Sequence, residues 1–122
     1  MAHGQIRHIE LPADDTARAC SFYAELFGWE FTEMDGYPGY FLFRFEEVGA
    51  SGGAIGERGK TTGERLRIFI DTDSIDDVLG RVEQLGGSIV EPKTEVTGQG
   101  WSAVIIDSEG NEVALFEGSD ET

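Results

Sequence analysis

The residues best suited to chemistry are a histidine and a glutamate two positions apart, His8 and Glu10, and an arginine further along, Arg67. Residues 5–11 alternate between polar and apolar side chains with the period of a β-strand, so His8 and Glu10 share one face. An imidazole beside a carboxylate can act as a general base. A guanidinium can pair with Glu10 or Glu112, or clamp a substrate carboxylate. We name His8, Glu10 and Arg67 as catalytic candidates. The alternative is a structural network, because buried polar groups usually satisfy one another.

Two further strands are expected to contribute side chains to the same face. Residues 65–71 and 112–116 also alternate, and one face of each carries polar or aromatic residues. Polar groups interleaved with aromatic rings on a concave face are typical of a ligand pocket. Trp101 follows a Gly-Gln-Gly segment, where its ring could stack on a ligand, and packing in the core or in an interface is the alternative. The residues expected to bind a ligand are His8, Arg67, Phe69, Trp101, Glu112 and Ala114.

Two helices are expected to position these strands. The first is predicted over residues 16–27, after acidic cap residues and before Gly28, and the second over residues 75–85, opened by a capping-box pair of Ser74 and Asp77. The predicted core face of the first helix carries Ala17, Cys20, Ala24 and Phe27, widened by Phe22, Tyr23 and Leu26. Strands are expected at residues 5–11, 29–34, 40–45, 54–55, 65–71 and 88–91 and on both sides of a turn at 107–111, with a loop at 92–100 and a mobile polar linker at 59–64.

The order of these elements repeats along the chain. Each half contains a strand, a helix and three more strands, and the pairs His8 with Arg67 and Gly28 with Gly87 are both 59 residues apart. One such unit cannot bury both faces of its sheet alone. We therefore predict an α+β fold in which two βαβββ modules, residues 5–58 and 64–118 of a single domain at 1–122, form a curled mixed sheet around a cleft, with helices on the outer face.

Composition restricts the partners. The 122 residues include 24 Asp and Glu against 9 Lys and Arg, for a formal net charge of −15. A field of that sign repels nucleic acid and anionic membranes, so we expect neither as a partner. It could reflect a solvated surface in a salt-rich cell or attraction of a basic ligand. The single cysteine, Cys20, allows no internal disulfide and fits a cytoplasmic location. Its place on the first helix favours core packing over nucleophilic work.

Several motifs resemble those of the vicinal oxygen chelate superfamily, which includes glyoxalase I, extradiol dioxygenases and bleomycin-resistance proteins. The resemblance covers nearly the whole chain, from about Gln5 to Glu117. It is carried by the segments at residues 8–15, 22–23, 26–29, 82–87, 92–95 and 107–111. The chain is similar in particular to small glyoxalase-like proteins. Because one fold hosts many reactions, this resemblance implies the fold more strongly than the chemistry.

The resemblance also implies where a metal site would be. Family enzymes hold a divalent metal with four side chains, one from each of four strands. These positions fall on His8, within residues 52–56, on Arg67 and on Ala114. Of these, His8 alone can donate a lone pair, because residues 52–56 are Gly, Ala and Ile and a guanidinium is permanently charged. We therefore predict no cofactor and no catalytic metal. Glu46, Glu47 or Glu57 could enter from a loop, but their spacing does not indicate it.

Three functions are compatible with these observations. The first is a glyoxalase-like small-molecule-binding protein with a degenerate metal site, acting as a lyase or isomerase on a small polar substrate. The second is a bleomycin-resistance-type protein that sequesters a cationic antibiotic, which the missing ligands and the net charge of −15 favour. The third is a structural or regulatory domain. The resemblance further implies a homodimer, since such chains commonly pair or swap modules, and a linker at residues 56–64 would permit a swap.

Overall fold

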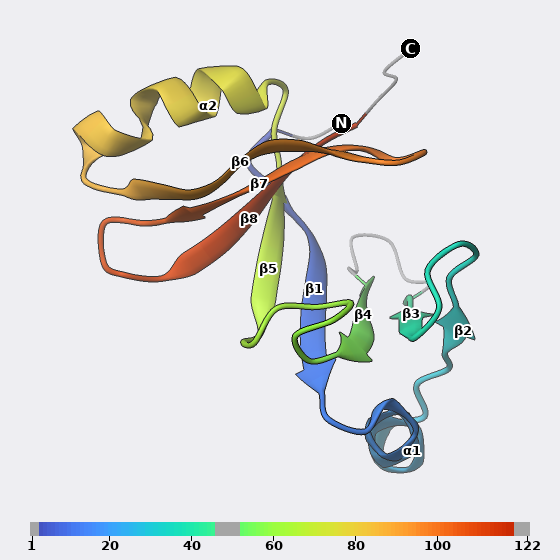
Figure 1. Cartoon of the computed structure of the whole chain (residues 1–122). Helices are drawn as coiled ribbons and strands as arrows, with labels where there is room; N and C mark the ends of the chain where they lie inside the picture. The colour runs from blue at the N-terminus through green and yellow to red at the C-terminus, as the bar shows by residue number, and fades with distance from the viewer. Residues whose placement is uncertain (1–2, 46–51, 119–122) are drawn as a thin grey trace. The chain divides into compact units, whose positions relative to one another are not determined.

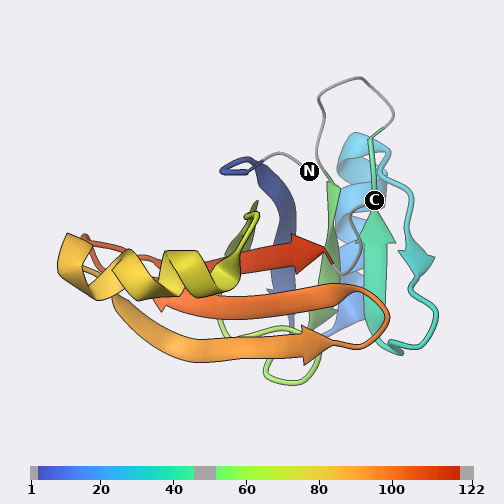
Figure 2. The same cartoon turned by 90° about the horizontal axis from the view of Figure 1, so that it is seen from above.

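A computed structural model describes residues 3–45 and 52–118 (Figures 1 and 2). The chain divides into two compact units. The N-terminal unit is Arg7–Arg67, and the C-terminal unit is Ile68–Thr122 together with Met1–Ile6. Neither helix in the described ranges is long and apolar enough to cross a membrane.

The N-terminal unit has one helix and a four-stranded mixed sheet. The strand order is β2-β3-β4-β1, in which β1 is parallel to β4 and the other neighbours are antiparallel. In chain order its elements are β1 (Ile6–Ala13), α1 (Thr16–Phe27), β2 (Thr32–Glu33), β3 (Tyr40–Phe43) and β4 (Gly52–Glu57).

The predicted ends of α1 are confirmed. The Asp15 side chain accepts a hydrogen bond from the Arg18 backbone N–H at the start of the helix. Gly28 ends it with φ of 77° and donates its N–H to the Ala24 carbonyl. The predicted core face is only partly correct, because Phe27 is 63% exposed. The helix residues that pack on the sheet are Ala19, Cys20 and Tyr23, against Leu11, Ala13, Phe43 and Ile55.

The C-terminal unit repeats this architecture. Its strand order is β5-β8-β7-β6, with β5 parallel to β8 and the other neighbours antiparallel. Figure 2 shows β6, β7 and β8 side by side. The predicted α+β class with two βαβββ modules is therefore confirmed. In chain order the elements are β5 (Arg67–Asp71), α2 (Ile75–Val82), a 3-10 turn (Glu83–Leu85), β6 (Ser88–Val96), β7 (Gly100–Ile106) and β8 (Glu112–Gly118).

Local hydrogen bonds explain the start of α2 and the last hairpin. The Ser74 hydroxyl accepts from the Asp77 backbone N–H, as the capping-box pattern predicts. In the hairpin turn, the Asp107 carboxylate accepts from the backbone N–H groups of Glu109 and Asn111, and these bonds hold its pKa below the usual value. Gly110 alone has positive φ there, at 89°.

Three expectations about the connecting segments are wrong. β6 does not stop at residue 91 but continues through Pro92 to Val96, with register shifts on both sides of Glu91 that accommodate the proline. The predicted strand 29–34 is reduced to β2. The predicted mobile linker is an ordered turn, in which the backbone N–H groups of residues 60–62 all donate to the Glu57 carbonyl.

Glycines in β4 let three strands pack closely. Gly53 lies opposite Ile9 of β1 and Phe43 of β3. A Cβ added at Gly53 would lie 2.0 Å from the Ile9 carbonyl oxygen and 2.9 Å from the Phe43 ring. Since the first of these is a backbone atom, a side chain could fit only if β1 and β4 moved apart.

We expect Gly53→Ala to lower the free energy of unfolding by at least about 2 kcal/mol, because overpacking against backbone cannot be relieved by a rotamer change. Urea denaturation followed by circular dichroism measures the loss. Gly80→Ala in α2 is the matched control. Nothing lies within 4 Å of its added Cβ, and it should stabilise by roughly 0.5–1 kcal/mol. Equal stability of the two variants would contradict this packing.

Candidate functional site

The two faces of the N-terminal sheet differ in chemistry. One face packs on α1 through Leu11 of β1 and Ile55 of β4. Because successive side chains of a strand alternate, the other face carries His8 and Glu10 of β1. Residue 40 of β3 belongs to that second face as well, since Phe43 packs on the α1 side. The polar face of this unit is therefore built by β1 and β3, with β4 between them.

Small residues in β4 leave room for side chains from both neighbouring strands to meet. On the polar face β4 presents Gly52, Ala54 and Gly56, which lie opposite His8, Glu10 and Pro12. Strands two positions apart in a sheet are separated by about 10 Å, a distance that a tyrosine and a glutamate can bridge together. A Cβ at Gly56 would lie 3.2 Å from the Tyr40 ring.

The Tyr40 hydroxyl joins His8 and Glu10. It donates a hydrogen bond to Glu10 Oε2 at 2.6 Å and lies 2.8 Å from His8 Nε2. A phenol has one hydrogen, so His8 Nε2 must be the donor in the second bond. The hydrogen-bond network thereby assigns the Nε2–H tautomer to His8. No hydrogen bond from the described residues reaches the other Glu10 oxygen, Oε1.

Burial is the largest cause of the pKa shifts of these three groups. It lowers the pKa of His8 to about 4, with help from the positive charges of Arg7 and Arg44, so the imidazole is neutral at pH 7. Burial raises the pKa of Glu10, opposed by the hydrogen bond from Tyr40 and the charge of Arg67. Burial and the neighbouring Glu10 carboxylate raise the pKa of Tyr40, so its hydroxyl remains protonated.

Arg67 lies close enough to Glu10 to favour its ionised form. Its guanidinium is half-buried, and the turn after β4 approaches it closely. A Cβ added at Gly63 would lie 3.0 Å from Arg67 Nη2. The structure thus brings together His8, Glu10 and Arg67, the three catalytic candidates, and supplies a positive charge beside a buried carboxylate.

A divalent metal does not fit this set of residues. Both His8 and Glu10 are bound to the Tyr40 hydroxyl, and Arg67 places a positive charge beside Glu10. In residues 3–45 and 52–118, no group of three or more His, Cys, Asp or Glu side chains could hold a metal ion. Of the loop glutamates, Glu57 lies against Gly39, while residues 46 and 47 lie outside the described residues. We derive no chemical step through a metal.

The remaining predicted ligand-binding residues belong to the C-terminal unit and fall on two faces of its sheet. Phe69 of β5 lies opposite Ala114 of β8, which is buried, and Glu112 is half-buried on the same face of β8. Trp101 is on the other face, where it packs with Ile75 and other apolar residues beneath α2. The Lys93 ammonium lies 4.9 Å from its ring centroid. The structure therefore does not bring Trp101 together with Phe69 and Ala114.

Tyr40 is the site residue that sequence reasoning missed. Residues 40–45 carry aromatic rings on both faces of an expected strand, so alternation alone could not choose the polar face. The signal that could have found it is the alternation of small residues at positions 52, 54 and 56, which leaves the space that a long side chain fills.

We expect His8→Gln to flatten the pH dependence of stability between pH 6.5 and 4. The folded-state pKa of about 4 lies below the ordinary value of 6.5, so the unfolded state binds more protons in this window. Stability is therefore lost as the pH falls, by up to about 3 kcal/mol from this group. The raised pKa of Glu10 acts in the opposite direction and remains in the variant.

Urea denaturation at half-unit steps of pH measures this effect. His3→Gln is the matched control, because His3 is exposed and belongs to the other unit. It leaves the hydrogen bond between His8 and Tyr40 intact, so it should keep the loss of stability that His8 causes. If His8→Gln and wild type showed the same slope between pH 6.5 and 4, His8 would not be buried as a neutral group.

Comparisons with known structures agree with this fold. NAD-dependent benzaldehyde dehydrogenase from Legionella pneumophila matches with a TM-score of 0.67 and 15% identity, over 91% of this chain and 97% of that one. A variant of Streptomyces coelicolor methylmalonyl-CoA epimerase in complex with 2-nitronate-propionyl-CoA matches with a TM-score of 0.69 and 16% identity, over 97% and 96%. Similarity at these identities shows the fold alone.

Sequence comparison identifies the family. A glyoxylase-like domain-containing protein of Didymella fabae is 59% identical over 29 residues, which are 24% of this chain and 23% of that protein. The match thus spans about a quarter of that relative. The family model of the Glyoxalase/Bleomycin resistance protein/Dioxygenase superfamily matches residues 5–115. The chain belongs to the Glyoxalase/Bleomycin resistance protein/Dioxygenase superfamily.

Proposed function

We propose that this protein is a metal-independent isomerase or lyase that moves a proton on a small polar substrate, with Glu10 as the proton acceptor. One observation carries the proposal. Glu10 is 7% exposed, one of its oxygens is fixed by Tyr40, and no hydrogen bond from the described residues reaches the other. Oε1 is therefore not committed to a protein donor among the described residues, as a group that takes up a substrate proton requires.

The chemistry follows from the raised pKa of Glu10. A carboxylate with a pKa above its ordinary value is a stronger base, and it is best suited to take a proton from an acidic carbon–hydrogen bond next to a carbonyl. The carbon–hydrogen bond breaks, its electron pair forms an enolate, and the proton moves to Glu10 Oε1. Return of the proton to either face or to a neighbouring atom completes an isomerisation, and loss of a leaving group completes an elimination.

The other residues have supporting roles in this proposal. Tyr40 holds Glu10 in one orientation through its hydrogen bond to Oε2. Arg67 supplies positive charge beside Glu10, which suits the carboxylate of a substrate or the negative charge of an enolate. His8 remains neutral and fixes the Tyr40 hydroxyl. The fold similarity to a protein described as an epimerase is consistent with this reaction class.

The alternative, sequestration of a cationic antibiotic, gains no support from the described site. It rests on the net charge of −15. Near Glu10, however, the positive charge of Arg67 compensates the carboxylate and His8 is neutral, so the site does not share the strong negative charge of the chain. We therefore propose an anionic or polar substrate.

Solvent deuterium exchange tests the proposal without knowledge of the physiological substrate. Proton NMR in D2O follows loss of the carbon-bound proton from a panel of small carboxylates that carry a neighbouring carbonyl group. Wild type should accelerate exchange for at least one member. Glu10→Gln should reduce that rate by about 10²–10⁴-fold, as expected for loss of a general base. Tyr40→Phe should reduce it about tenfold or more.

Glu25→Gln is the matched control, because Glu25 is an exposed carboxylate on α1. It should exchange the substrate at the wild-type rate. A Glu10→Gln variant that is folded by circular dichroism and keeps full exchange activity would contradict the role of Glu10. Absence of exchange with every member of the panel would count against proton transfer next to a carbonyl.

A further inference from the structure

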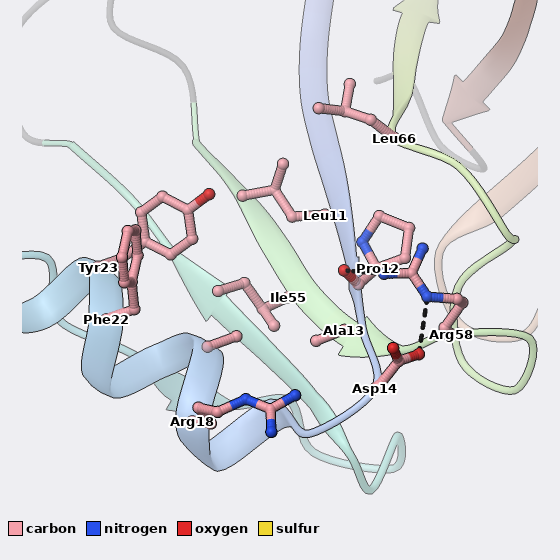
Figure 3. A pocket seen from close by; sticks show the side chains of 11 residues that line it. Leu11, Pro12, Ala13, Asp14, Arg18, Phe22, Tyr23, Ile55, Arg58 and Leu66 are labelled. Carbon is pink, nitrogen blue, oxygen red and sulfur yellow. Dashed lines mark hydrogen bonds and ion pairs between the residues drawn. The ribbon is translucent and has the colours of Figure 1, made fainter.

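A cavity of about 550 Å3 opens in the N-terminal unit, on the face that carries α1 (Figure 3). It is separate from the polar site, because residues of the α1-side core line it and His8, Glu10 and Tyr40 do not. Volumes of this size are typical of small-molecule sites. The proposed reaction does not use this cavity, so any ligand of the cavity must be recognised by the cavity lining itself.

The walls are mostly apolar. Leu11 of β1 and Ile55 of β4 form the sheet side, Phe22 and Tyr23 of α1 form the helix side, and Leu66 lies at the edge (Figure 3). Phe22 is 56% and Leu66 58% exposed, so apolar surface of both side chains is accessible to a ligand in the cavity. Covering them with an apolar ligand would remove this surface from water, which favours binding.

Of the two arginines that line the cavity, Arg58 is already paired within the chain, whereas the Arg18 guanidinium has no partner among the described residues. Arg58 Nε pairs with Asp14 Oδ1 at 2.8 Å, and its Nη1 donates to the Glu64 carbonyl at 2.8 Å. Arg58 therefore braces the turn after β4. Arg18 projects from α1 beside the cavity (Figure 3), and its guanidinium makes no hydrogen bond or ion pair within the described part of the chain.

The charge balance at the cavity is opposite to that of the chain. Two arginines and one aspartate line it, whereas the whole chain has a net charge of −15. An uncommitted guanidinium beside apolar walls complements a ligand with one negative group and an apolar body. The positive charge of Arg18 would repel a cation, and a purely apolar molecule would leave the N–H donors of Arg18 without an acceptor.

We propose that this cavity binds an amphipathic carboxylate. The carboxylate pairs with the Arg18 guanidinium, and the apolar body lies between Leu11, Phe22 and Leu66. This site is independent of the proton-transfer site on the other face of the sheet, so either proposal can fail alone.

Decanoate is the probe, and decyltrimethylammonium, with the same chain and the opposite charge, is its control. Isothermal titration calorimetry with the full chain measures both. Decanoate should bind more tightly than the cation. Arg18→Gln should weaken decanoate binding about three- to tenfold, the range expected for an exposed charged pair with good geometry. Leu66→Gln should weaken it as well, and because Leu66 is exposed the fold should be unaffected.

Arg81→Gln is the matched control, since it removes the same charge from an exposed position on α2 in the other unit. It should leave decanoate binding unchanged. Equal binding by Arg18→Gln and wild type, or equal affinity for the two probes, would overturn the proposal. So would an absence of decanoate binding together with a dimer, seen by sedimentation, that Leu66→Gln dissociates, because that result would assign the surface to a second copy of the chain.

Discussion

The hydroxyl group of Tyr40 is the contact on which the polar site depends. It crosses β4 to bind His8 and Glu10, two side chains of a strand that is not its neighbour. That crossing is possible because β4 carries only glycine and alanine on this face, at Gly52, Ala54 and Gly56. The same run of small residues lacks any metal ligand. The small residues of β4 therefore have two consequences. They leave this strand without a metal ligand, and they make room for the contact between Tyr40 and Glu10.

This network gives a simple account of the electrostatics. Burying an ionised carboxylate is costly unless hydrogen bonds and an opposite charge compensate it. Glu10 accepts one hydrogen bond from Tyr40 and lies near the positive charge of Arg67. These two interactions only partly offset the effect of burial, so the pKa of Glu10 stays above its ordinary value. A group held in this state can accept a proton readily. In this account, the increased basicity of Glu10 comes from incomplete compensation of its burial, and no metal is required to produce it.

Much of the fold could be predicted from the sequence. The caps of both helices, the repeated element order and the family were readable because they depend on local hydrogen bonding and on periodicity. The sequence predicts a strand that ends before Pro92, but β6 continues to Val96. It continues because it pairs with β7 on both sides of the proline, and this pairing cannot be read from local sequence. The turn at residues 59–64 was misread as mobile, because its order comes from hydrogen bonds to the Glu57 carbonyl.

The site was predicted less completely. Alternation placed His8 and Glu10 on one face, but it could not show which rings of residues 40–45 share that face. Contacts between strands separated by 30 residues or more depend on pairing, which a single sequence does not specify. The expected homodimer, ligand and cytoplasmic location stay predictions.

The central claim is that the Tyr40 hydroxyl donates to Glu10 and accepts from a neutral His8. A long-range 15N–1H NMR spectrum of the His8 ring at pH 7 tests it most directly, with His8→Gln to assign the signals. The account predicts a neutral imidazole with the proton on Nε2, because the single Tyr40 hydrogen is committed to Glu10 Oε2. A neutral ring protonated on Nδ1 instead, or a doubly protonated ring, would contradict it.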